Sequence, residues 1–286
     1  MAVELEIRDG NPWWLSPDIW VVPGSDPEGA PGQPIAGTPA YLWARVRNNG
    51  SSSVTNAQVN FYWADPSAGF DRTTAHPIGT SFVSLDPGQS SDVLCLQPWV
   101  PEYVNGGHEC VLAEAFHNPS DPLPATPVFN VPGDRHVAQR NLSVVLALKG
   151  GFFRFTFNLF NTARLERRFR VTLEAGEAEQ LKPLLPHLGK GFELPELGGR
   201  LAGARFVEDM CADPEAHSGT HQGAEAPHLA VTIPARRKIN RTLIGRIEGG
   251  PALLHLVQRD GERVVGGLSL LVLPGEDAQK TQAQSA

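Results

Sequence analysis

Residues 40–50 read AYLWARVRNNG, a run in which apolar and polar side chains alternate with a period of two. In an extended strand the two alanines, the leucine and the valine share one side, and the aromatic and arginine side chains share the other. The closing Asn-Asn-Gly tolerates left-handed backbone and so favours a turn. A second alternating run, VNFYWA, follows at residues 59–64. Two such runs around a turn predict short antiparallel strands.

The composition allows two β-sandwiches. The chain has 286 residues, of which 41% are hydrophobic, so it is long and apolar enough for two cores of ordinary domain size. Its 29 glycines and 25 prolines follow no collagen-like period and suit many strands joined by many turns. We therefore expect an all-β protein of two antiparallel immunoglobulin-like β-sandwich domains in tandem.

Charge and aromatic residues divide the chain into two parts. The first 147 residues hold 6 Lys/Arg against 15 Asp/Glu, whereas the rest hold 18 against 16. All six tryptophans and all three tyrosines also lie in the first part. We expect a polar lead-in over residues 1–11, an immunoglobulin-like sandwich over 12–147, a second, smaller sandwich over 148–274, and a flexible polar tail over 275–286.

Three local patterns refine the expected strands. Residues 135–145 are predicted to form the last strand of the first sandwich. Apart from Glu109 and Glu114, residues 109–116 are apolar on both faces, so the pattern leaves their inward face open. Two apolar arms within residues 253–273 flank an Asp-Gly pair, which predicts a hairpin. Helix-forming residues at 177–185 are ended by prolines and allow at most a turn or two of helix.

Five segments carry a resemblance to a known family. They are SPDIWV at 16–21, VRNNG at 46–50, YWADP at 62–66, GHECVLA at 107–113 and HVAQRN at 136–141. Together they resemble the bacterial immunoglobulin-like module of the cell-adhesion-related CARDB kind, which is appended to secreted peptidases and surface proteins. The resemblance implies a β-sandwich with a role in contact. It does not fix a function, because such modules are attached to many different proteins.

The sequence carries no export or membrane signal that we can identify. The first residues lack a basic segment and an apolar segment, and no run of 18 apolar residues occurs. We expect a cytoplasmic protein, or one released by a route without a cleavable N-terminal signal, and no membrane insertion.

Motifs for catalysis and cofactor binding are missing from the sequence. It contains no GxSxG elbow, no HExxH, no CxxC pair and no phosphate loop in a strand–loop–helix context. We expect neither an enzyme nor a cofactor. The alternative is a metal-dependent hydrolase organised on one loop that is rich in metal-binding side chains. Its candidate ligands are Cys211, His217, His221 and His228.

Cys95 and Cys110 lie on predicted strands that are expected to be neighbours. Two buried thiols acting as small apolar groups are the expected state in a reducing compartment, and a disulfide is the alternative.

Candidate contact residues fall into an aromatic and a basic set. The aromatic set, Tyr41, Trp43, Trp13 and Trp14, could stack on a sugar or fill a partner's pocket. The basic set, Arg236, Arg237 and Lys238, lies near further arginines at 164–170, 241 and 246. Nucleic acid is not expected, because the second part is only slightly basic and has no tryptophan or tyrosine.

We interpret the protein as a non-catalytic structural or interaction subunit of a larger bacterial assembly. An acidic first part and a basic second part would favour contacts with other proteins, including copies of itself arranged head to tail. A carbohydrate-binding module that uses exposed aromatic side chains is the main alternative.

Overall fold

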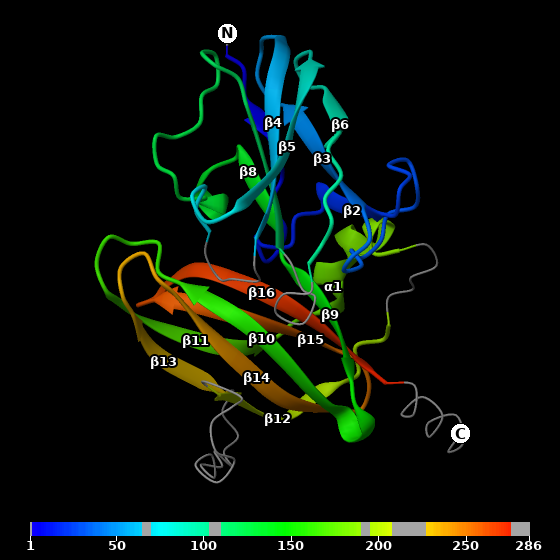
Figure 1. Cartoon of the computed structure of the whole chain (residues 1–286), viewed down its shortest axis with the longest axis vertical. Helices are drawn as coiled ribbons and strands as arrows, with labels where there is room; N and C mark the ends of the chain where they lie inside the picture. Colours follow the sequence, from blue (N-terminus) through cyan, green and yellow to red (C-terminus); the bar gives the residue numbers. More distant parts are fainter. Residues whose placement is uncertain (1, 65–69, 103–109, 190–194, 208–226, 276–286) are drawn as a thin grey trace. The chain divides into compact units, whose positions relative to one another are not determined.

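The computed structural model describes residues 2–64, 70–102, 110–189, 195–207 and 227–275. Strands make up 54% of the chain and the one α-helix is short, which confirms the predicted all-β class (Figure 1). Four sheets are present in the described residues, and their strands are mainly antiparallel.

The sheets divide between two compact units that are not consecutive along the chain. The first unit takes the described residues of Met1–Asp65, Phe70–Asn141 and Glu179–Leu194. The second takes those of Leu142–Ala178 and Pro195–Ala286, as well as a short segment outside the described residues. The described residues of Glu179–Leu194 therefore belong to the first unit, although residues of the second unit come before and after them in the chain.

The first unit is a sandwich of two sheets. One sheet has the order β1-β3-β2, and β6 also pairs with β3. The second sheet has the order β5-β4-β7-β8. Its strands are β1 (Leu5–Glu6), β2 (Ile19–Pro23), β3 (Ala40–Asn48), β4 (Val54–Ala64), β5 (His76–Leu85), β6 (Ser90–Leu94), β7 (Cys110–Phe116) and β8 (Val137–Arg140).

The predicted alternation of β3 is confirmed residue by residue. Ala40, Leu42, Ala44 and Val46 are fully buried, and the side chains between them are half-buried. The buried set faces Val59 and Phe61 of β4 and other apolar residues of the opposite sheet in one continuous core. Burial of this stripe provides the main driving force for closing the sandwich, because the free energy gained scales with the apolar area removed from water.

Strand β7 is buried on both faces, which explains why its inward face could not be chosen from the pattern. Val111, Ala113 and Ala115 join the core between the sheets. Cys110 and Leu112 point the other way, into a second apolar cluster with Tyr62 and Phe129. Residues after β7 and before β5 cover this cluster, so the outer face of the sheet is not a solvent face there.

One carboxylate lies beside the second cluster. Glu114 is 1% exposed and accepts hydrogen bonds from the Tyr62 hydroxyl at 2.6 Å and from Arg72 at 2.8 Å. Burial, and then the hydrogen bond to Glu114, raises the pKa of Tyr62. The buried charge is thus paired, as a buried carboxylate requires.

Leu112→Ala tests whether the second cluster contributes to stability. We expect the free energy of unfolding to fall by about 3 kcal/mol, because the substitution leaves a cavity in a covered apolar cluster. Urea denaturation followed by tryptophan fluorescence measures it. Phe82→Ala, at a 62% exposed position of β5, is the control and should change stability by less than about 0.5 kcal/mol. Equal losses of unfolding free energy in Leu112→Ala and Phe82→Ala would show that the second cluster does not contribute to stability.

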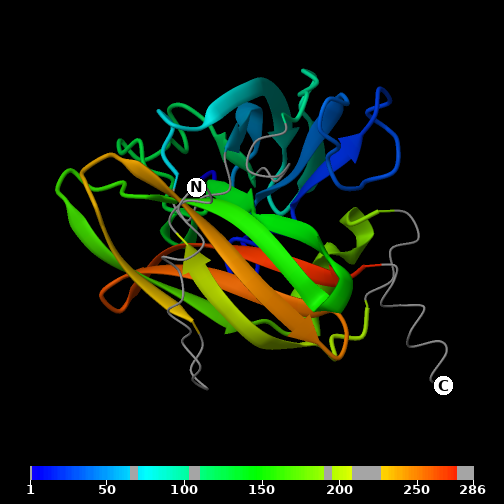
Figure 2. The ribbon, with the colours of Figure 1, turned by 60° about the horizontal axis from the view of Figure 1, so that its bottom comes forward.

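The second unit is also a sandwich, and Figure 2 shows its two sheets as separate layers. One has the order β10-β14-β12 and the other β13-β11-β15-β16-β9. Its strands are β9 (Leu142–Ala147), β10 (Phe152–Phe160), β11 (Arg167–Ala175), β12 (Arg200–Val207), β13 (His228–Ile233), β14 (Lys238–Glu248), β15 (Ala252–Asp260) and β16 (Arg263–Pro274).

Aromatic residues of β10 fill the second core. Phe153, Phe155, Phe157 and Leu159 alternate along the strand and are all buried between the sheets. The predicted hairpin is confirmed as β15 and β16, which pair antiparallel from Ala252 to Asp260. Its turn contains Gly261 at φ 59°, a left-handed conformation that glycine adopts without strain.

The last strand predicted for the first sandwich is divided between two sheets, and this corrects the single strand expected over residues 135–145. β8 pairs antiparallel with β7, whereas β9 pairs parallel with β16. The break falls at Asn141, whose backbone N–H donates to the carbonyl of Trp14. Residues 135–145 contain no glycine or proline that would mark where the chain leaves one sheet for another, so the pattern could not show the break.

The short helix expected over residues 177–185 is confirmed. It consists of α1 (Ala178–Leu181) followed by the 3-10 helix η3 (Lys182–His187). Pro183 and Pro186 lack the N–H groups that a longer helix would need, which keeps the segment short.

Candidate functional site

The outward face of β3 gathers aromatic and arginine side chains with their cross-strand neighbours. We name this surface the aromatic–arginine face; it comprises Trp20, Tyr41, Trp43, Arg45 and Arg47. Because β3 is the middle strand of its sheet, each of its side chains has a neighbour on one or both sides. Trp43 lies between Trp20 and Leu94, and Arg45 lies opposite Asp92.

The rings of this face are held in place. Trp20 and Trp43 stack with their centroids 5.9 Å apart and their planes within 5° of parallel. The Trp43 indole N–H donates to the carbonyl of Pro27 at 3.0 Å, and the Arg45 guanidinium lies 5.9 Å from the Trp20 ring centroid. Each of these contacts restricts a rotamer, so the face is ordered before any partner arrives.

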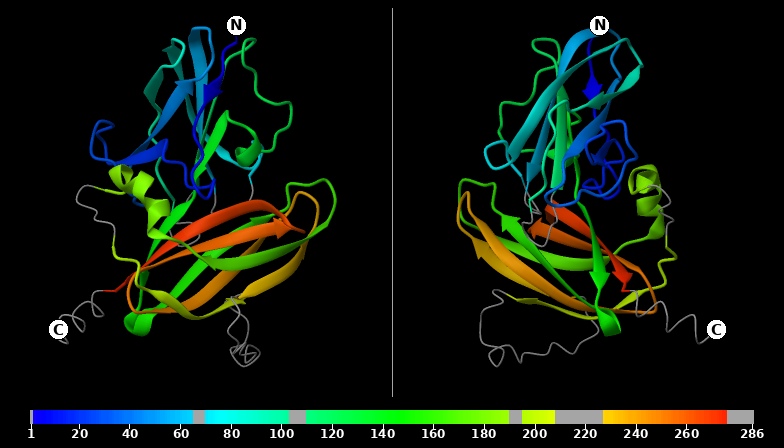
Figure 3. Two further views of the ribbon diagram at one scale, coloured as in Figure 1. Left: turned by 180° about the vertical axis from the view of Figure 1, so that it is seen from behind. Right: turned by 45° about the vertical axis from the view of Figure 1, so that its right-hand side comes forward.

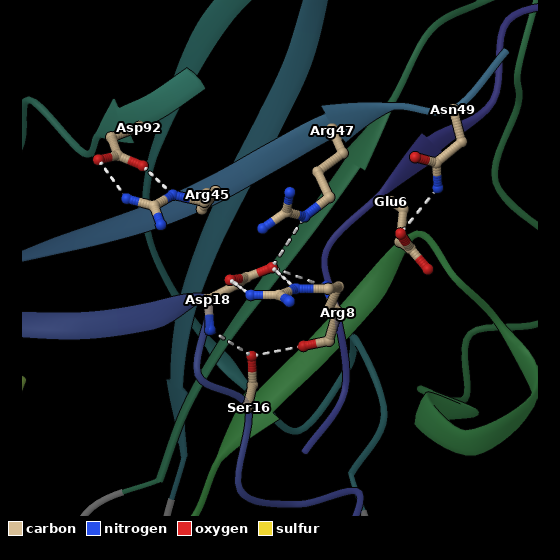
Figure 4. A network of polar contacts seen from close by, with 8 residues as sticks. All are labelled: Glu6, Arg8, Ser16, Asp18, Arg45, Arg47, Asn49 and Asp92. Carbon is tan, nitrogen blue, oxygen red and sulfur yellow. Dashed lines mark hydrogen bonds and ion pairs between the residues drawn. The ribbon is translucent and has the colours of Figure 1, made fainter. Parts of the chain in front are cut away.

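A buried carboxylate anchors the arginines (Figure 4). Asp18 is 1% exposed and receives two hydrogen bonds of 2.8 Å from the Arg8 guanidinium. The Arg47 guanidinium lies 3.5 Å from the same carboxylate. Burial opposes ionisation of Asp18, but the bonds from Arg8 and the charge of Arg47 hold its pKa below the ordinary value. The N-terminal segment and β3 are thus joined through one charge.

The second arginine pair lies closer to solvent. Arg45 binds Asp92 of β6 through two hydrogen bonds of 2.6 and 2.8 Å, and the two side chains are 39% and 38% exposed. This bidentate geometry fixes the plane of the guanidinium. Solvent screening keeps the stabilisation small, so the pair orients Arg45 more than it stabilises the fold.

Asp18→Asn should destabilise the protein by about 2 to 3 kcal/mol, because it leaves Arg8 and Arg47 without their shared buried counter-charge. Asp92→Asn is the matched control on the same face, with an expected loss below about 1 kcal/mol. Chemical denaturation of both variants at neutral pH measures the two losses. If the exposed pair proved as important as the buried one, the anchoring role of Asp18 would be refuted.

The segment that returns to the first unit adds a histidine to the face. His187 stacks on Trp20 with ring centroids 4.5 Å apart, and its backbone carbonyl accepts a hydrogen bond from Arg140 at 3.2 Å. Burial, followed by the charges of Arg140 and Arg45, lowers the pKa of His187 to about 4. The imidazole is therefore neutral at pH 7, which suits a ring stacked beside arginines.

This lowered pKa predicts a pH dependence of stability. In the unfolded chain His187 has its ordinary pKa of 6.5, so between pH 6.5 and pH 4 the unfolded state binds the proton more readily. The contribution of His187 to the free energy of unfolding should be fully present above pH 6.5. It should be lost as the pH falls toward 4, by about 2 kcal/mol after allowance for partial exposure. His187→Phe keeps a ring for the stack and should lose this part of the pH dependence in denaturation measured at both ends of the range. If the free energy of unfolding fell equally in the wild type and in His187→Phe between pH 6.5 and pH 4, His187 would not be the source of this pH dependence.

The second unit carries a surface of different character, which we name the basic end. It comprises Arg164, Leu165, Arg167 and Arg168 around the β10–β11 connection and Arg236, Arg237 and Lys238 at the β13–β14 turn. Figure 3 shows the two connections side by side, green and orange, as does Figure 1. Each of these residues is exposed, and Leu165 reaches 69%.

A buried asparagine fastens the two connections together. The Asn161 amide NH2 donates to the carbonyls of Leu165 and Ile233, both at 2.9 Å. Its backbone N–H donates to the carbonyl of Arg237 at 3.0 Å. Arg236 adopts φ 56°, an uncommon value for a residue with a side chain, so the turn is held in a constrained shape.

Two of the four predicted aromatic contact residues lie on the aromatic–arginine face. Tyr41 and Trp43 are half-buried on the outer side of β3, as the alternation indicated. Trp13 is half-buried and packs edge-on against Trp14 at 5.2 Å. Trp14 is only 3% exposed. The sequence analysis missed Asp18 and His187, because no sequence pattern links Asp18 to Arg47 or His187 to Trp20.

The predicted cysteine and metal sites have different outcomes. Cys95 and Cys110 are buried free thiols, and they belong to different apolar clusters. Burial raises the pKa of both.

Of the metal candidates, Cys211, His217 and His221 lie outside the described residues, and His228 is exposed at the start of β13. In the described part of the chain, no three His, Cys, Asp or Glu side chains gather as metal ligands.

Among the described residues, no helix is long and apolar enough to cross a membrane.

Comparisons with known proteins add little to this geometry. No family model matches the chain, and no curated protein matches it. Among solved structures, red sea bream transglutaminase is 11% identical with a TM-score of 0.25, over 91% of this chain and 31% of that one. The β-glucosidase DesR of Streptomyces venezuelae is 18% identical with a TM-score of 0.21, over 40% and 15%. The CupB6 tip adhesin of Pseudomonas aeruginosa is 10% identical with a TM-score of 0.23, over 96% and 98%.

The chain thus spans less than a third of the transglutaminase and about a seventh of the glucosidase. With TM-scores of 0.25 or less, these likenesses carry no argument about this chain.

Proposed function

We propose that the protein is a non-catalytic interaction module that binds a protein partner through the aromatic–arginine face. The observation that carries the proposal is that half-exposed Trp43 and Arg45 are held in place against the Trp20 ring, which is itself 7% exposed and supports them from beneath. Tryptophan, tyrosine and arginine are the side chains that dominate binding energy in protein interfaces. Because their rotamers are already fixed, little conformational entropy is lost on binding.

The detailed geometry favours a protein partner over a sugar. Trp43 stacks on Trp20 and its N–H is already bonded to Pro27, so its ring presents an edge and part of a face rather than an open platform. Arg45, Arg47 and the exposed carboxylate of Asp92 make the edge of the same surface polar, whereas Asp18 lies buried beneath Arg47. An apolar centre with a polar rim is the usual organisation of a protein interface.

The family resemblance supports the same proposal at a finer level. A CARDB-type module in the first unit would act as an accessory piece of a bacterial assembly, presenting one rigid face for contact. Seven of its strands, β2 to β8, form two facing sheets, which is the count of an immunoglobulin-like domain.

Site-specific photo-cross-linking in the host organism tests the proposal. A photoreactive amino acid at Tyr41 should give one discrete cross-linked protein product, because this side chain borders the tryptophan stack. Trp43→Ala in the same chain should reduce that product at least about tenfold, as the loss of an interface tryptophan often costs 2 kcal/mol or more.

The same photoreactive amino acid at Phe82, exposed on the other sheet, is the matched control and should give no such product. Identical products from both positions, or none from position 41, would contradict the proposal. Retention of the wild-type protein, but not Trp43→Ala, on a glycan array would instead favour the carbohydrate-binding alternative.

A further inference from the structure

The basic end is a preformed cationic surface. It combines six exposed Arg and Lys side chains from two connections that lie about 70 residues apart in the sequence, and Asn161 holds both in one arrangement. Among the described residues, Glu166 lies within the first connection, and Asp260 lies 3.9 Å from Arg167. Positive charge therefore predominates at this end.

Several of these charges have no carboxylate partner within the described part of the chain. Arg164, Arg168 and Arg237 make no ion pair there. Leu165, next to Arg164 in the sequence, is 69% exposed. An exposed aliphatic residue beside charged residues is a combination that contact surfaces use. Arginine also binds carboxylates through two parallel hydrogen bonds, so the surface suits carboxylate groups in particular.

Charge complementarity identifies an occupant. The first 147 residues carry 15 Asp/Glu against 6 Lys/Arg, and many of these carboxylates lie on the surface. Exposed examples are Glu4, Asp26, Glu28 and Asp86. A second copy of this chain therefore offers, at equal concentration, a surface whose charge is opposite to that of the basic end.

We infer that the basic end docks on the acidic first unit of a second copy of this chain, giving head-to-tail association. The contact is heterologous, because different surfaces of the two copies meet, so repetition yields a ring or an open filament. The inference rests on the proposal that the protein works by contact, and it names one partner and a second contact surface.

Sedimentation of the full chain at rising concentration tests the inference. We expect oligomers at about 0.01 M salt and monomers at about 1 M salt, since the Debye length falls from about 30 Å to about 3 Å between them. The double variant Arg164→Glu/Arg237→Glu should weaken association at least tenfold at low salt. Neither side chain makes a described ion pair, so the fold should survive, which circular dichroism checks.

Arg154→Glu supplies the matched control, because Arg154 is an exposed arginine of β10 outside the basic end. This variant should associate like the wild type. A wild-type chain that stays monomeric at low salt and high concentration would overturn the inference, as would an equal loss in Arg154→Glu. Binding of monomers to phosphatidylserine vesicles that is lost in the double variant would also overturn it and assign the surface to a membrane.

The two variants distinguish failure of the self-association inference from failure of the proposed function. Trp43→Ala should keep its self-association, and Arg164→Glu/Arg237→Glu should keep the cross-link formed from position 41. Loss of association in Trp43→Ala would show that the aromatic–arginine face, and not the basic end, joins the copies, and would overturn the inference.

Discussion

The shared buried charge of Asp18 is the constraint on which the first unit's functional surface depends. A carboxylate that is 1% exposed is stable only when cations surround it, and here Arg8 and Arg47 supply them from segments about 40 residues apart. That requirement holds the N-terminal segment against β3 and fixes the direction of two arginines. The tryptophan stack on the same sheet is held separately, by the Trp43 bond to Pro27 and by the Arg45 and His187 side chains against Trp20.

The two units use the same architecture for different surfaces. In the first, the ordered surface is the outer side of a sheet, where cross-strand neighbours restrain each side chain. In the second, the corresponding surface consists of connections, and a single buried asparagine does the restraining. Sheet faces favour flat, aromatic contacts, whereas connections can concentrate charge without the repulsion that like charges suffer when directly opposed in a sheet. The division of aromatic and basic residues between the units follows this difference.

The sequence predicted the features that follow from the alternation of apolar and polar side chains along a strand. It indicated both sides of β3, the β15–β16 hairpin and the all-β class, because side-chain direction in a strand follows position alone. It left the inward face of β7 open, because a covering segment makes both sides of that strand apolar. It failed at Asn141, where the chain changes sheet without a glycine or proline to mark the break.

The candidate surfaces were predicted only in part for a similar reason. Tyr41 and Trp43 follow from the alternation, but the contacts of Trp20 with His187 join residues that are 167 positions apart. The two basic segments were visible separately, and only the fold brings them together through Asn161. Contacts between distant segments leave no periodic signal in a single sequence, so they become visible only in three dimensions.

The central claim is that an ordered aromatic–arginine face is the surface by which this protein contacts others. Hydroxyl-radical footprinting of the protein inside its host cells, compared with the purified protein, tests it most directly. The account predicts that oxidation of Tyr41 and Trp43 falls severalfold in the cell while that of Phe82 is unchanged. Equal oxidation of Tyr41 and Trp43 in both settings would contradict it.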